Sequence, residues 1–330
     1  MYVTTTNERR TTGSASLTTS GQHANQLARD PIARVPTLVY AASLAVAALT
    51  AIVSAVGLAS GSLYTADPVP ARGVVASSAG VLVPGLQAHD GFNLIVGLPL
   101  LLCVVWLAHR RSLVGLLLWP GALFYLLYTY AIYAVGAPFG PLFLVYVGLV
   151  GLTACTTIGL VASIDSVAVR HKLAGSVPAR AIGGVLIVLA LMTVAQDAGG
   201  AIATALAGGT QIEPVARRVW TIDLALEVPA VLAGGALLWR RAPLGYAVGA
   251  GLLLQFALTP LALAVILALQ PPLTGSPMDA GTIIGVLVFV AVCFTLLAFF
   301  AHGASNRPRT RFQSRLAHRA SRSRWESWTP

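Results

Sequence analysis

The sequence predicts an all-α integral membrane protein with eight transmembrane helices. Of its 330 residues, 56% are hydrophobic and 10% are charged, whereas a soluble domain carries about 25% charged residues. Apolar runs of about 20 residues, the length that crosses the hydrocarbon core of a bilayer, recur along the chain. We count eight of these runs, at 37–59, 91–109, 112–134, 141–163, 181–203, 219–239, 243–269 and 281–302.

The positions of the basic residues predict that both termini are cytoplasmic. With the N-terminus inside and eight spans, eighteen of the 21 Lys and Arg residues fall on the inner side, and only Arg72, Arg217 and Arg218 fall outside. This is the positive-inside bias of membrane proteins, so the net charge of +10 needs no nucleic-acid partner. The preference for Arg over Lys suits a GC-rich bacterium, and we expect a bacterial plasma-membrane protein.

The first four runs follow a polar segment, residues 1–36, that lacks periodicity and is expected to be disordered. The first run therefore acts as an uncleaved anchor.

The connection 60–90 is predicted to be a plain outer loop, with a lid over an outer cavity as the alternative. Asp90 is expected to cap the second run. The third run holds four tyrosines, of which one or two could contact a carboxylate or line a cavity.

The last four runs follow a cytoplasmic linker, 164–180. The sixth run lies between Trp220 and Trp239, which are about 28 Å apart along a helix and suit the two membrane interfaces. The C-terminal segment 303–330 is expected to bind anionic lipid headgroups, at about 1 kcal/mol per basic residue. Its arginines are Arg307, Arg309, Arg311, Arg315, Arg319, Arg322 and Arg324.

An internal repeat relates the two halves of the chain, 37–163 and 181–302. Residues 91–143 align with 221–273 without gaps, with 13 identities in 53 positions, including Pro, Arg-Arg, Gly and Thr in register. Both copies run in the same direction across the membrane. The pattern favours a parallel 4+4 repeat, an arrangement that some transporters use to form a site between their halves.

The sixth run carries two carboxylates, Asp223 and Glu227, which share a face because they are four residues apart. They lie about 5 Å and 10 Å inside the outer hydrocarbon boundary. Two ionised carboxylates there would repel, so at least one is expected to hold a proton unless a cation binds. A charge at this depth is costly, and a position facing the helix bundle is expected.

Other polar residues fall at a similar depth and predict an acidic pocket open to the outside. They are Asn93, Asp197 and Gln255, and Tyr128 of the third run is the tyrosine that could contact a carboxylate there. Each of the three carboxylates has a plain alternative. Asp197 could end a helix, Asp223 could pair with Arg218, and Glu227 could form a structural hydrogen bond. We expect no metal and no cofactor, because the sequence has no metal-binding or nucleotide-binding motif and its three cysteines lie inside separate runs.

The segments "RRSLVGLLLWPGALFYLLYTYAIYAVGAPFGPLFLVYV" (110–147) and "IDLALEVPAVLAGGALLWRRAPLGY" (222–246) resemble a group of bacterial multi-pass membrane proteins with no assigned activity. The resemblance implies an architecture and no function.

Three functional hypotheses remain from the sequence. The first is a transporter of a small solute or cation, including a proton-coupled one, with the acidic residues as its site. The second is a membrane enzyme that modifies a lipid, against which stands the lack of a recognised nucleophile. The third is a non-catalytic sensor or complex component that acts through the basic tail. The sequence favours the first and leaves the oligomeric state open.

Overall fold

The computed structural model describes residues 35–60, 85–137, 140–206, 214–274 and 280–305. Eight helices in these segments are long and apolar enough to cross a membrane, which confirms the predicted number of spans. They are Thr37–Ala59, Gly85–His109, Leu113–Gly136, Phe143–Ser163, Ala179–Leu206, Arg217–Trp239, Pro243–Leu269 and Ala280–Ala304. The expected polar tail 1–34, most of the outer loop and the seven arginines of the C-terminal tail lie outside the described residues.

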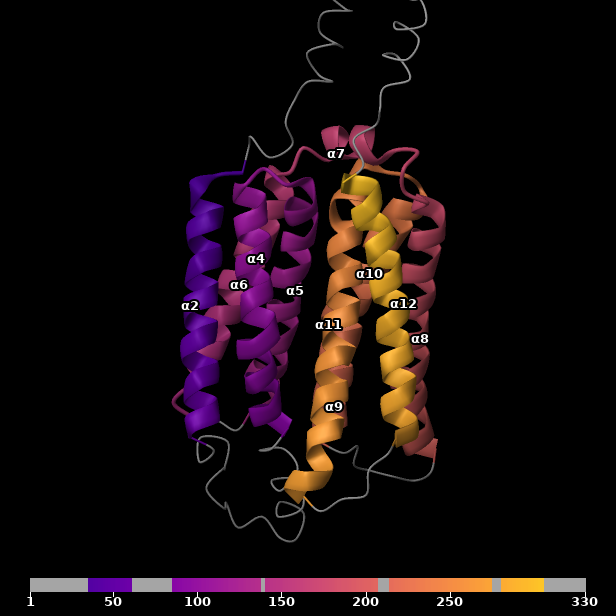
Figure 1. The fold of residues 1–330 in the computed structure, drawn as a ribbon. Coiled ribbons are helices and arrows are strands. Elements are labelled where there is room, and N and C mark those ends of the chain that lie inside the picture. The colour runs from indigo at the N-terminus through magenta and orange to yellow at the C-terminus, as the bar shows by residue number, and fades with distance from the viewer. Residues whose placement is uncertain (1–34, 61–84, 138–139, 207–213, 275–279, 306–330) are drawn as a thin grey trace, which may run out of the picture.

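The regular elements of the described residues are all helical. They are α2 (Thr37–Ala59), the π-helical segment η2 (Asn93–Gly97), α4 (Leu98–His109), α5 (Leu113–Gly136), α6 (Phe143–Ser163), α7 (Ser166–Leu173), α8 (Ala179–Leu206), α9 (Pro214–Ile222), the π-helical segment η3 (Asp223–Glu227), α10 (Val228–Trp239), α11 (Pro243–Thr274) and α12 (Ala280–Ser305). The short helix α7 lies across one end of the bundle, and α9 lies at the other end (Figure 1).

The long helices form two groups of four. One group holds α2, α4, α5 and α6, and the other holds α8, α10, α11 and α12 (Figure 1). The groups meet chiefly where α5 packs against α11. Gly121 and Gly251 allow this close approach, because a Cβ atom added to Gly121 would lie 2.2 Å from the Gly251 carbonyl oxygen.

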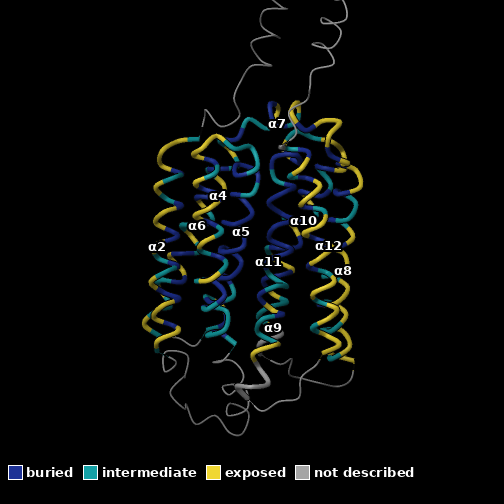
Figure 2. The backbone as a smooth tube through the Cα atoms, viewed as in Figure 1, coloured by how far each residue is buried: buried dark blue, intermediate teal, exposed yellow. Residues whose placement is uncertain are grey.

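The central position of α5 explains its burial. In its most apolar window 83% of the residues are buried, whereas α12 buries 22% of the corresponding window. Figure 2 shows buried residues along α5 and exposed ones along the outer helices. The outer faces carry large apolar side chains such as Leu38, Ile158 and Ile284, which are exposed as lipid-facing residues are.

Two turns at the α7 end have the same local structure. They occupy equivalent positions in the alignment of 91–143 with 221–273. Arg111 and Arg241 have φ angles of 60° and 56°, which are the positive values found at non-glycine residues of the described chain. The following helix packs tightly on the preceding one in both cases. A Cβ atom on Gly115 would lie 2.5 Å from Leu107, and one on Gly245 would lie 2.3 Å from the backbone of Leu238.

The same alignment pairs the two π-helical segments, and each ends two residues before a proline, Pro99 or Pro229. A proline ring inside a helix removes one amide donor and collides with the carbonyl of the residue four positions earlier. Widening the preceding turn relieves that collision, and the amide of Leu98 then bonds to the Asn93 carbonyl five residues back. Val228 bonds to the Asp223 carbonyl in the same way.

Two expectations about helix ends, at Asp90 and Asp197, were wrong. The second span begins at Gly85, so Asp90 lies inside the helix and does not cap it. Asp90 is fully buried and accepts a hydrogen bond from the Tyr133 hydroxyl at 3.2 Å. The fifth span ends at Leu206, close to the predicted end at 203, and the alternative in which Asp197 ends a helix is wrong because Asp197 is buried within α8.

A candidate acidic site between the two helix groups

The site is built on η3, where Asp223 begins and Glu227 ends the π-helical turn. The widened turn still places both carboxyl groups on one face, and both residues are buried, with 7% and 6% of their surface exposed. Because π-helical turns are rare and cluster at functional positions, their occurrence at the carboxylate pair marks this part of the sixth span.

A tyrosine from the other helix group contacts the first carboxylate. The Tyr128 hydroxyl on α5 donates a hydrogen bond to Asp223 Oδ1 at 2.6 Å. Tyr128 and Ile222 also belong to a small apolar cluster separate from the main core. The hydrogen bond therefore joins the two groups of helices at the acidic residues.

The second carboxylate is held from α11. Gln255 Nε2 donates to Glu227 Oε1 at 2.5 Å and lies 3.1 Å from the Thr259 hydroxyl. Gln255 is fully buried, and its own Oε1 has no hydrogen-bond partner. A buried amide oxygen without a donor is uncommon, because its desolvation is then uncompensated. The site therefore contains an acceptor that a bound cation or a protonated group could satisfy.

Asp197 on α8 completes a group of three carboxyl groups. Its carboxyl group lies close enough to interact electrostatically with those of Asp223 and Glu227. Ionised carboxylates this close repel one another and are costly to bury, so the group requires protons or a cation among the three side chains. The second oxygen of Asp197 is buried without a partner.

No arginine or lysine of the described chain forms an ion pair with these carboxyl groups. Arg218, which could have neutralised Asp223, instead donates to the Gly136 carbonyl oxygen at the end of α5. The alternative in which Arg218 pairs with Asp223 is therefore wrong. Within the described residues no group of three or more His, Cys, Asp or Glu side chains is arranged to hold a metal ion.

Asn93, which was also predicted as a site residue, does not join the acidic group. It is fully buried, and its Oδ1 accepts a hydrogen bond from the Tyr125 hydroxyl at 2.7 Å. The same hydroxyl lies 3.2 Å from His89 Nε2, which is 3.5 Å from Thr129 Oγ1. The first helix group thus has a polar cluster of its own. Sequence reasoning missed His89, although it lies one helical turn before Asn93.

The two polar clusters occupy positions that the alignment of the two halves pairs with each other. Asn93, Gly97 and Tyr125 stand in one half where Asp223, Glu227 and Gln255 stand in the other. A Cβ atom on Gly97 would lie 3.0 Å from the Tyr125 ring. In the first half an amide thus replaces the first carboxylate, a glycine replaces the second, and an aromatic ring lies beside the glycine. The paired carboxylates are a feature of the second half.

Five of the six predicted site residues therefore come together, namely Asp197, Asp223, Glu227, Gln255 and Tyr128. Comparison of the chain with protein-family models, with curated protein sequences and with solved structures finds no match. The class of protein defined by the fold is a helical multi-pass membrane protein.

Proposed function

We propose that this protein is a proton- or cation-coupled transporter of a small solute, and that Asp223 and Glu227 form its coupling site. The observation that carries the proposal is a buried group of three carboxyl groups without a basic partner in the described residues. Such a group is unfavourable in a membrane and is retained where it binds a proton, an ion or a substrate.

The position of Tyr128 suggests how site occupancy is coupled to movement. Its hydroxyl donates from the first helix group to a carboxyl group of the second. A cation between Asp223 and Glu227 would compete for the same oxygens, and a proton on Asp223 would weaken it as an acceptor. Occupancy of the site would thereby change how strongly the two groups are held together on that side of the Gly121–Gly251 contact.

The proposal includes a parallel 4+4 repeat, in which α5 and α11 are equivalent helices that cross at equivalent glycines. Support comes from the two turns with positive φ and the two π-helical segments, because each pair occupies aligned positions in the two halves. Sites of parallel-repeat transporters lie between the halves. The acidic group fits that location because Tyr128 and Gln255 come from α5 and α11.

We further propose that the end bearing α7 faces the cytoplasm of a bacterium. Among the described residues, the basic side chains at that end outnumber those at the α9 end. They are Arg110, Arg111, Arg170, Lys172, Arg180, Arg240 and Arg241, against Arg217 and Arg218. This excess follows the positive-inside rule. The acidic group would then lie in the outer half of the membrane, with the basic tail on anionic lipid.

The test is proton flux in liposomes that contain the purified protein and a pH-sensitive dye. We would add Na⁺, K⁺ or Li⁺, and then panels of amino acids, sugars and organic cations, across an imposed pH gradient. Wild-type protein should dissipate the gradient with at least one addition. Glu227→Gln and Asp223→Asn should each abolish that flux, because the substituted side chain can no longer exchange a proton.

Asp90→Asn is the matched control, because Asp90 is also a buried carboxylate but lies in the first-half cluster. It should retain flux. Glu227→Gln keeps an oxygen that accepts from Gln255, so its unfolding temperature should match that of wild type. Flux that persists in both acidic-site variants would refute the proposal. Loss of flux in Asp90→Asn alone would move the site to the other cluster.

A further inference from the structure

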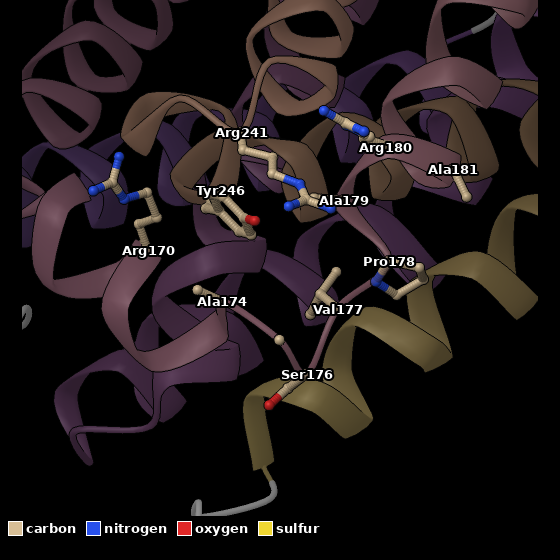
Figure 3. A pocket seen from close by; sticks show the side chains of 11 residues that line it. Arg170, Ala174, Ser176, Val177, Pro178, Ala179, Arg180, Ala181, Arg241 and Tyr246 are labelled. Carbon is tan, nitrogen blue, oxygen red and sulfur yellow. The ribbon is translucent and has the colours of Figure 1, made fainter.

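A basic cavity lies at the end of the molecule opposite the acidic group, beside α7. It has a volume of about 830 Å³ and is lined by the turn between α7 and α8, the start of α8 and the turn between α10 and α11. Figure 3 shows Arg170, Arg180 and Arg241 around it, with Tyr246 between them. Three arginines on three different elements thus line one cavity.

The cavity is suited to an anion. None of the three arginines forms an ion pair with a carboxylate of the described chain, and no acidic residue lines the cavity. The amides of Arg180 and Ala181 belong to the first turn of α8, where amide groups have no partner within the helix. The positive end of the helix dipole therefore adds to the three guanidinium charges.

The loop that forms the floor of the cavity is held in place. Gly175 has a φ of +89°, and the Ser176 and Val177 amides both bond to the Leu173 carbonyl. Gly303 on α12 packs so closely that a Cβ atom there would lie 2.7 Å from Val177. The loop that lines the cavity is therefore packed against α12.

An apolar groove lies beside this cavity, along the membrane-spanning part of α8 and α10. It has a volume of about 820 Å³, lies between α8 and α10, and shares Ala181 with the arginine cavity. Val188 and Trp239 line it, and they are 55% and 50% exposed. Gly184 lets the Trp239 ring lie against α8, because a Cβ atom at Gly184 would be 2.5 Å from that ring.

We propose that the arginine cavity and the groove together bind one anionic phospholipid, with its phosphate among Arg170, Arg180 and Arg241 and one acyl chain along Val188 and Trp239. A basic cavity between transmembrane helices at the cytoplasmic surface is a known setting for anionic headgroups. A free phosphate would use the cavity alone. The apolar groove next to the cavity favours the lipid, and the site is independent of the acidic group.

The first test is thermal unfolding of the full-length protein in detergent, with phosphatidylglycerol, phosphatidylcholine or inorganic phosphate added. Phosphatidylglycerol should raise the unfolding temperature at a lower concentration than phosphatidylcholine or inorganic phosphate does. In Arg170→Gln/Arg180→Gln the half-maximal concentration should rise by about twenty-five-fold, which is about fivefold for each arginine near an anionic headgroup.

Lys172→Gln/Arg217→Gln is the control, because it removes the same charge from side chains that do not line the cavity. It should respond to phosphatidylglycerol as wild type does. An equal loss in both double variants would mean a general charge effect and would refute the site. Equal stabilisation by inorganic phosphate would identify a free phosphate as the ligand and would also refute the lipid.

The second test locates the acyl chain. Phosphatidylglycerol with brominated acyl chains quenches tryptophan fluorescence on contact, and the difference between wild type and Trp239→Phe isolates Trp239. Quenching of Trp239 should fall in Arg170→Gln/Arg180→Gln and stay unchanged in the control. Quenching that is identical in both double variants would show that Trp239 senses only bulk lipid, and would overturn the assignment of the groove.

Discussion

The contact between Gly121 and Gly251 is expected to control how closely the two helix groups approach. In Gly121→Ala the new Cβ atom would lie 2.2 Å from the Gly251 carbonyl oxygen and 2.5 Å from its Cα. Backbone atoms cannot rotate away as a flexible side chain can, so α5 and α11 must separate by about 1 Å to reach ordinary van der Waals distances.

The free-energy change follows from two opposing contributions. Overpacking costs about 1–3 kcal/mol, and a backbone collision belongs at the upper end of that range. Replacing a helical glycine by alanine returns about 0.5–1 kcal/mol. The free energy of unfolding should therefore fall by about 2 kcal/mol. Separation of α5 from α11 should also lengthen the Tyr128–Asp223 hydrogen bond and reduce transport.

The assay is equilibrium unfolding in mixed micelles, followed by far-ultraviolet circular dichroism. Gly148→Ala on α6 is the control, because nothing lies within 4 Å of a Cβ atom there, and it should be neutral or stabilising. Gly121→Ala/Gly251→Ala should cost less than the sum of the single variants, since one separation of the helices accommodates both added methyl groups. If Gly121→Ala is as stable as Gly148→Ala, α5 and α11 do not cross at these glycines.

Three other predictions concern separate parts of the chain. Tyr128→Phe should lower the free energy of unfolding by about 1–3 kcal/mol, because a buried carboxyl group loses a donor; unchanged stability and transport would contradict the role given to the hydroxyl. Trp119→Phe removes the 3.1 Å hydrogen bond from the indole to Ser43, and should cost about 1–3 kcal/mol in the same unfolding assay because the hydroxyl is fully buried. In a cysteine-free background, Ser176→Cys should react with a membrane-impermeant maleimide only when the cytoplasmic face is accessible, and labelling of intact cells would invert the proposed orientation.

The acidic group was predictable in part because its first members lie on one short segment. Asp223 and Glu227 are four residues apart, and their shared face follows from helical geometry alone. Gln255 was predicted from its depth in the membrane, and Tyr128 as a tyrosine able to contact a carboxylate. Depth is a property of each helix by itself, so it is readable from hydropathy and from the tryptophans at the span ends.

The hydrogen-bond partners of Asn93 and Asp90 could not be predicted in this way. Asn93 has the depth of Asp223, yet it bonds to Tyr125, and Asp90 one helical turn earlier bonds to Tyr133. Which residues meet at one depth depends on the rotation of each helix about its axis. That rotation results from close packing between helices, here at Gly121 and Gly251, and a single helix carries no record of it.

The sequence by itself determined the eight spans and the carboxylate pair on the sixth, because transfer of about 20 apolar residues from water into lipid is favourable whatever their neighbours are. Only the tertiary structure decided that Asp197 joins that pair, that Arg218 leaves it without a counter-ion, and that arginines from three elements line one cavity. The physical reason is that hydrophobicity adds up along a chain, whereas hydrogen bonds and charge pairs require particular side chains within about 3–4 Å of one another in the packed bundle.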